Sequence, residues 1–245
     1  MGSSYRQFCP VAKAMELFDE RWTLLIVREL VLGSEHFNEL RRGLPRMSPT
    51  LLSKRLHQLA AAGIVERTTN GSNVRYVLTP AGRGLEPVVE ALGTWGARWT
   101  GRLGDQDLDP TLLMWDMHRC VDRTVTPDSR TIVQFTFLGT ARASRRWWMV
   151  ITSGDVDVCD EDPGFEVTVR VIADLRALTE IWRGELGWSH ALRSGRCGDR
   201  RTGGAPTELA DVVRTAVVRR RRTIGGRPTR LRRVSQDGKA QHCTA

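Results

Sequence analysis

The chain has 245 residues, of which 40% are hydrophobic, and it carries 37 basic and 28 acidic side chains for a formal net charge of +9. This length and composition predict one or two globular domains with real hydrophobic cores. No apolar run reaches the roughly eighteen residues of a membrane-spanning helix and no signal sequence opens the chain, so we expect a cytoplasmic protein. Five cysteines without a Cys-x-x-Cys pair argue against a disulfide framework and against a zinc site.

Residues 11–45 predict three helices. The first covers 11–18, and a strongly apolar second helix covers 22–32 and ends at Gly33. A short third helix, marked by Phe37 and Leu40, closes at 43–45. Helices in this order open a helix-turn-helix scheme.

The segment 46–63 predicts a helix with two contrasting faces. It begins with the N-cap Ser48 followed by Pro49, and it stops at Gly63. An apolar face carries Leu52, Leu56 and Leu59 at helical spacing. The opposite face carries hydrogen-bonding or basic side chains and none that is acidic: Thr50, Ser53, Lys54 and His57. Such a helix suits the major groove of DNA.

Two runs rich in β-forming residues follow, at 64–69 and 74–79. They flank Asn70-Gly71, and an Asn-Gly pair between such runs is a strong hairpin signal. The apolar helix at 22–32, the short third helix, the helix with two faces and the basic hairpin together predict a winged helix-turn-helix domain.

These motifs resemble the HxlR-type winged-helix transcriptional regulators. The residues that carry the resemblance are Cys9-Pro10-Val11, Trp22-Thr23-Leu24-Leu25-Ile26, Phe37-Asn38-Glu39-Leu40, Ser48-Pro49, Leu52-Ser53, Leu56, Leu59, Gly63 and Tyr76-Val77-Leu78-Thr79-Pro80-Ala81-Gly82. The resemblance covers about the first hundred residues and implies a dimeric DNA-binding repressor or activator. A two-fold dimer would place its reading helices about 34 Å apart, so a pseudo-palindromic operator is expected.

The expected DNA contacts divide into two groups. Base or near-base contacts are assigned to Thr50, Ser53, Lys54 and His57. Ser48, the N-cap of the same helix, is also expected at the DNA-binding surface. Phosphate contacts are assigned to Arg46, Arg55, Arg67, Asn73 and Arg75. The alternative for any single arginine is a solvated helix face, and for the whole set it is an ordinary small helical domain.

A further helix is expected over 80–102, with Pro87 in its first turn or at a kink. Its apolar stripe comprises Leu85, Val88, Val89, Leu92, Trp95, Gly96 and Trp99. With the helix at 11–18, this stripe is the expected dimer interface; the alternative is that it packs on the second domain. Cys9 stands at the start of the first helix, and the resemblance implies a possible thiol sensor there. The alternative is a small buried residue at the interface.

A glycine-bearing linker at 101–109 leads to a second domain. The pattern predicts a helix over 111–121, strands over 131–138, 146–152, 155–159 and 165–172, and helices over 174–182 and 188–192. The predicted fold class is therefore α+β, with domains at 1–105 and 106–200 and a tail at 201–245.

The second domain resembles sterol-carrier-type lipid-binding domains in element order and in the phrases Asp155-Val156-Asp157-Val158-Cys159 and Asp174-Leu175-Arg176-Ala177-Leu178. The resemblance implies an apolar cavity for a small hydrophobic effector. Its expected lining is Trp115, Phe135, Phe137, Trp148 and Trp182, which are otherwise simple core aromatics.

The tail at 201–245 has a net charge of +8 and is rich in arginine and glycine. We expect a disordered extension that adds sequence-independent affinity for DNA; the alternative is a terminus without function. No catalytic motif, metal site or cofactor site is predicted. The competing function is a lipid or small-molecule carrier whose first domain serves only to dimerise it.

Overall fold

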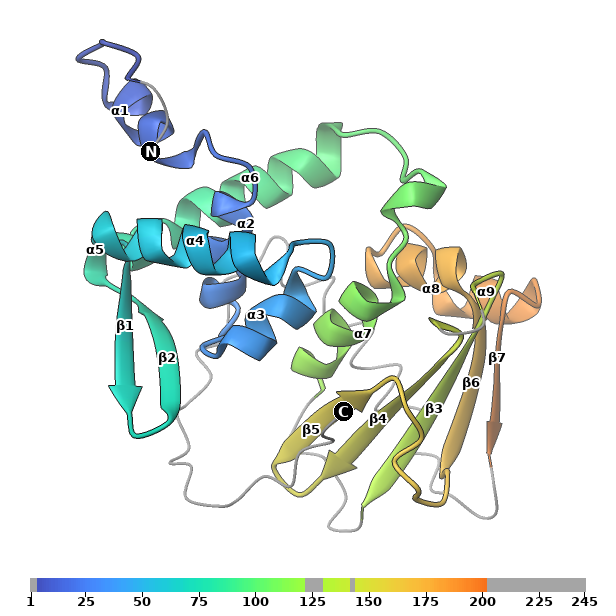
Figure 1. The fold of residues 1–245 in the computed structure, drawn as a ribbon. Helices are drawn as coiled ribbons and strands as arrows, with labels where there is room; N and C mark the ends of the chain where they lie inside the picture. Colours follow the sequence, from blue (N-terminus) through green and yellow to red (C-terminus); the bar gives the residue numbers. More distant parts are fainter. Residues whose placement is uncertain (1–3, 122–129, 142–143, 202–245) are drawn as a thin grey trace. The chain divides into compact units, whose positions relative to one another are not determined.

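The computed structural model describes residues 4–121, 130–141 and 144–201 (Figure 1). The chain divides into two compact units, Met1–Gly101 and Arg102–Ala245. Each unit is built around its own cluster of buried hydrophobic side chains. Nearly all of the predicted basic tail lies outside the described residues. Within the described ranges, no helix is both long enough and apolar enough to cross a membrane.

The first unit consists of short helices and one hairpin. Its helices are α1 (Pro10–Phe18), α2 (Thr23–Val31), α3 (Phe37–Gly43), α4 (Pro49–Ala61), α5 (Pro80–Arg83) and α6 (Glu86–Trp99). Between α4 and α5, the strands β1 (Val65–Asn70) and β2 (Asn73–Leu78) pair antiparallel. Gly71 lies in the connecting turn with a φ of +60°, a conformation that favours glycine. This order of elements is that of a winged helix-turn-helix domain.

The core of the first unit is aliphatic and joins α2, α3, α4 and the base of the hairpin. Its fully buried members are Ile26, Val27, Leu40, Leu52, Leu56 and Leu59. The hairpin contributes Val65 and Leu78 to this cluster. At the start of α5, Gly82 packs so closely on the hairpin that an added Cβ would lie 2.2 Å from the carbonyl oxygen of Ile64. Helix α4 and the β1–β2 hairpin, the wing of this domain, therefore share one core.

A buried carboxylate holds α3 against α2. Glu29 is fully buried, and Arg28 donates from Nη2 to its Oε1 at 2.6 Å and to the carbonyl oxygen of Gly43 at 3.1 Å. An added Cβ at Gly43 would lie 1.8 Å from the Glu29 carboxylate. Burying a charged group is tolerated where it is paired in this way. The pairing fixes the helix that precedes α4.

The second unit combines one mixed sheet with helices. Its elements are the short 3₁₀ helix η1 (Asp105–Asp107), α7 (Pro110–Arg119), β3 (Thr131–Leu138), β4 (Arg146–Thr152), β5 (Asp155–Cys159), β6 (Val169–Asp174), α8 (Leu175–Trp182), α9 (Trp188–Arg193) and β7 (Cys197–Arg201). The strand order is β5-β4-β3-β6-β7, in which β3 and β6 are parallel and the other pairs are antiparallel. Asp174 caps α8 as predicted, because its Oδ1 accepts from the amide of Ala177 at 2.9 Å.

Two strand predictions in this unit differ from the structure. The strand expected at 165–172 begins instead at Val169, and β7 was not predicted. Phe165 lies in the connection that leads to β6, 42% exposed, with Arg130 4.0 Å from its ring centroid. The segment 197–201 contains no β-branched or aromatic residue, so its pairing with β6 depends on tertiary contacts.

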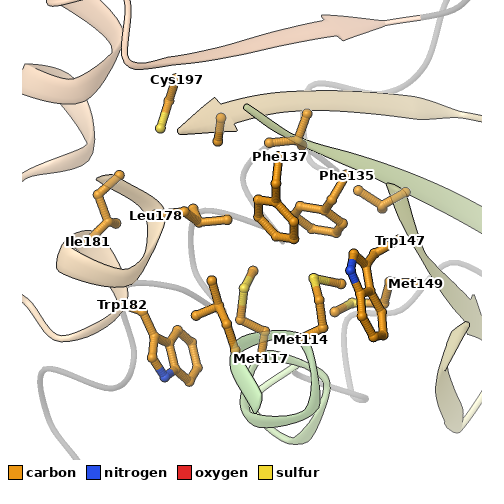
Figure 2. Close-up of a cluster of buried hydrophobic side chains, with 14 of the residues drawn as sticks. Met114, Met117, Phe135, Phe137, Trp147, Met149, Leu178, Ile181, Trp182 and Cys197 are labelled. Atoms are coloured by element: carbon orange, nitrogen blue, oxygen red, sulfur yellow. The ribbon is translucent and has the colours of Figure 1, made fainter. Parts of the chain in front are cut away.

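One face of the sheet packs against α7 and α8 in a core rich in aromatic and methionine side chains (Figure 2). Phe135 and Phe137 on β3 lie with ring centroids 6.4 Å apart and face the helices. Labelled neighbours in Figure 2 are Met114, Met117, Trp147, Met149, Leu178, Ile181 and Trp182. All of these side chains are buried.

The five aromatic residues predicted to line one cavity do not lie together. Phe135, Phe137 and Trp182 share the core cluster, but Trp148 packs on the opposite face of the sheet with Ile132 and Val167. The prediction for Trp148 was wrong because neighbouring residues in a strand point to opposite faces, and Trp147 takes the core side. Trp115 is buried outside this cluster, with its ring 4.0 Å from that of His118.

Candidate nucleic-acid interface

The recognition helix α4 is placed by its cap and by its buried leucines. The Oγ of Ser48 accepts a hydrogen bond from the amide of Leu51 at 3.3 Å, which satisfies one of the free amides of the first turn. Pro49 occupies the first helical position, where no amide is needed. Leu52, Leu56 and Leu59 are at most 2% exposed and anchor the helix in the core.

The opposite face of α4 is exposed along its length. It presents two hydroxyls, an ammonium and an imidazole, from Thr50, Ser53, Lys54 and His57. All four side chains offer hydrogen-bond donors, and none carries negative charge. This face is open to bind an electron-rich surface such as the base edges and phosphates of a duplex.

Arg55 does not belong to this face. Its side chain is 9% exposed, forms an ion pair with Glu20 and donates to Oε1 of Gln58 at 2.6 Å. The assignment of Arg55 to a phosphate contact was therefore wrong. The spacing of Arg55 in the sequence could have shown this. Arg55 comes three residues after Leu52 and four before Leu59, which places it on the buried side of the helix.

The wing presents exposed polar side chains beside α3. Arg67, Asn73 and Arg75 are all exposed on the hairpin, and Arg46 is exposed just before α4. Arg75 forms an ion pair with Glu35, so part of its charge is already neutralised.

One main-chain and one side-chain contact hold the hairpin against the residues just before α3. The amide of Tyr76 donates to the carbonyl oxygen of Glu35 at 2.8 Å, and Nδ1 of His36 lies 3.1 Å from the carbonyl oxygen of Val74. Sequence reasoning did not find Glu35 and His36, because contacts between segments so far apart in the chain leave no local pattern.

The first unit also exposes apolar side chains on two of its helices. On α6 they are Val88, Leu92, Trp95 and Trp99, which are 51–64% exposed, and on or just before α1 they are Phe8, Val11 and Met15. Neither α1 nor α6 buries any residue fully. Leu85 and Val89, which were predicted in the same stripe, pack instead against the core of their own unit. Exposed aromatic patches of this kind are typical of interaction sites.

The described cysteines differ in access. Cys9 at the N-terminus of α1 and Cys120 at the C-terminus of α7 are partly exposed, whereas Cys159 and Cys197 are buried. Burial raises the pKa of the Cys197 thiol to about 11. Of the four described thiols, Cys9 and Cys120 are therefore the more accessible, and Cys9 is the one in the first unit.

The comparison with protein families matches the part of the chain that holds α4 and the hairpin. The family model for the HxlR-like helix-turn-helix matches residues 17–103. The uncharacterized HTH-type transcriptional regulator YvaP of Bacillus subtilis (strain 168) is 32% identical over 111 residues, which are 44% of this chain and 95% of that protein. The uncharacterized HTH-type transcriptional regulator sll1512 of Synechocystis is 35% identical over 94 residues, 37% of this chain and 70% of that protein.

Among solved structures, the reduced form of the transcriptional regulator YodB from B. subtilis is 31% identical, with a TM-score of 0.34 over 38% of this chain and 96% of that one. The sequence relationship to the curated regulators spans most of their length, and it covers the capped recognition helix and the hairpin described above. The chain therefore belongs to the HxlR-like helix-turn-helix family of DNA-binding transcriptional regulators.

Proposed function

We propose that the protein is a sequence-specific regulator that inserts α4 into the major groove of its operator. The observation that carries the proposal is the exposed, donor-rich and acid-free face of α4, backed by buried leucines. Lys54 and His57 reach acceptors on guanine or phosphate, and Thr50 and Ser53 lie beside them near the base edges.

The phosphate contacts come from the flanks of α4. Arg46 and the capped turn at Ser48 lie at one end of the helix, and Arg67 and Asn73 extend from the wing. Arg75 contributes less than an unpaired arginine, because DNA must compete with Glu35 for its guanidinium. These contacts set the register of the protein on DNA, and those of α4 set its sequence preference.

The active form is a homodimer that pairs through α1 and α6. Four exposed hydrophobic side chains on one side of α6, two of them tryptophans, are costly to leave in water. A two-fold dimer binds two half-sites separated by one turn of the duplex, so the operator is pseudo-palindromic.

Fluorescence anisotropy with the DNA upstream of the protein's own gene tests the DNA-binding proposal. Wild-type protein should bind this DNA more tightly than an unrelated duplex, and Lys54→Ala should weaken specific binding by about 1–3 kcal/mol. Arg193→Ala is the matched control, because it removes an exposed cationic side chain on α9 in the second unit, which belongs neither to α4 nor to the proposed dimer surface. Equal affinity for all duplexes would favour the carrier function instead.

Sedimentation equilibrium tests the dimer. The wild-type chain should sediment as a dimer at micromolar concentration, and Trp95→Ser should shift it toward the monomer. Trp188→Ser, on the partly exposed start of α9 in the second unit, provides the control. A monomeric wild-type chain would contradict this part of the proposal.

The regulator acts in the cytoplasm as a repressor, and two inputs are proposed for it. One is oxidation of the accessible thiol of Cys9 at the edge of the proposed dimer surface. The other is a small apolar effector in the sterol-carrier-like second domain, where methionines beside Phe135 and Phe137 are adaptable in shape. Release of operator DNA by a thiol oxidant, abolished in Cys9→Ser, distinguishes the first input from the second.

A further inference from the structure

The buried side chain of Arg55 connects the recognition helix to the turn between α1 and α2. Its guanidinium pairs with Glu20, which lies in that turn and is 35% exposed. A second nitrogen of Arg55 is held by Gln58, while its Nε is buried with no hydrogen-bond partner among the described residues. A guanidinium in this position is not available to DNA, so its role must be exerted inside the protein.

The turn that supplies Glu20 is itself constrained. The carbonyl oxygen of Glu20 accepts hydrogen bonds from the hydroxyl of Thr23 at 2.7 Å and from the amide of Thr23 at 3.2 Å. Trp22 has a φ of +79°, in the left-handed region that is costly for any residue other than glycine. A strained turn persists only where its surroundings hold it, and the ion pair to α4 is one such restraint.

The space between α1, the turn and α4 is not filled by apolar side chains. A small pocket lies among Leu17 of α1, Glu20 of the turn, and Arg55 and Gln58 of α4. This cavity of about 20 Å³ has room for roughly one water molecule. Because α1 buries no residue fully and Leu17 packs only partly against the core, the ion pair in the adjoining turn adds a polar restraint to a limited apolar contact.

We propose that Arg55 is a positioning residue that ties the orientation of α4 to α1 through Glu20. A displacement of α1, which contributes Val11 and Met15 to the proposed dimer surface, is thereby transmitted to the helix that reads DNA. The inference rests on the proposed DNA-binding function and adds the link by which changes at the dimer surface reach the operator.

A charge exchange tests the link. Glu20→Arg and Arg55→Glu each place two like charges together, and we expect each to weaken operator binding by about 5- to 150-fold, the usual range of coupling between sites. The double variant restores an ion pair in reverse order and should recover most of the affinity. If Arg55 contacted phosphate directly, the double variant would remain weak and the salt dependence of binding would fall by about one counterion. That result would overturn the proposal.

Hydrogen exchange provides a readout that does not require DNA. In Arg55→Met, which keeps the apolar stem, and in Glu20→Gln, the amides of α1 and of the turn should exchange faster, while those of β1 and β2 stay protected. Arg41→Met, on the exposed side of α3, is the matched control. Unchanged exchange in α1 would refute the link even if DNA binding fell.

Failure of the two proposals can be told apart. If the wild-type chain binds no duplex yet exchange in α1 responds to Arg55→Met, the DNA-binding proposal fails and the mechanical link stands. If the wild type binds its operator and the charge exchange recovers nothing, the link fails and the DNA-binding proposal stands.

Discussion

The two units of this chain differ in which side chains they bury and which they expose. In the first unit the core is aliphatic, and the polar face of α4 and the aromatic face of α6 are exposed. In the second unit most aromatic and methionine side chains are buried between the sheet and its helices. A function can be inferred for the first unit because the polar face of α4 and the aromatic face of α6 are exposed to partners. In the second unit the aromatic and methionine side chains stabilise the core, so they do not identify a ligand.

The largest expected effect tests whether the second unit is held by its aromatic core. Phe135 is 1% exposed, so Phe135→Ala should destabilise that unit by about 3–5 kcal/mol through lost burial and a cavity. Urea unfolding measures the loss. Phe165→Ala, at a side chain 42% exposed, should cost much less. Operator affinity that fell in step with the stability of Phe135→Ala would show that the two units do not work separately.

A glycine in the first unit gives the next largest effect. In Gly82→Ala the new methyl group would lie 2.2 Å from a main-chain oxygen of Ile64, and we expect a loss of about 1–3 kcal/mol from overpacking. Gly93→Ala on α6 is the control, because open space surrounds an added Cβ there and alanine favours the helix. Thermal unfolding should separate the two variants, and equal melting temperatures would argue against the close packing of α5 on the wing.

The cap of the recognition helix gives a smaller effect. Ser48→Ala removes the acceptor of the Leu51 amide and should cost about 1 kcal/mol of stability. Ser48→Asp, which retains an acceptor, should lose much less stability. Chemical denaturation measures the free energy of unfolding of both variants. A Ser48→Ala variant as stable as the wild type would show that the cap does not stabilise α4.

The smallest effect concerns the thiols. At pH 8, iodoacetamide should modify Cys9 in the native protein, and Cys197 should react only after unfolding. Because the folded pKa of Cys197 is raised to about 11 from 9.0, the native state holds this proton more tightly than the unfolded chain does. The associated stability is complete below pH 9 and is lost as the pH rises toward 11. Peptide mapping locates the modified thiols. Alkylation of Cys197 in the native protein would contradict the packing of β7.

The first unit could be predicted well because its signals are local. Ser48-Pro49, Gly63 and Asn70-Gly71 fix where α4 and the hairpin begin and end, and the structure confirms each. Arg55 was misplaced because a basic residue in a basic helix suggests DNA, whereas its partner Glu20 lies 35 residues away.

The second unit was less predictable because its pairings are long-range. The parallel pairing of β3 with β6 and the recruitment of β7 depend on segments far apart in the chain. The alternation along β4 separates Trp147 from Trp148, a distinction that residue type alone cannot make.

Selection of bound duplexes from a random pool, performed with wild-type protein and with Lys54→Ala, tests the central claim most directly. If the outer face of α4 reads the major groove, the wild type will enrich a pseudo-palindromic sequence. The variant will change the preferred bases within each half-site while the spacing of the half-sites stays the same. An identical sequence from both proteins, or no enrichment by the wild type, would contradict the account.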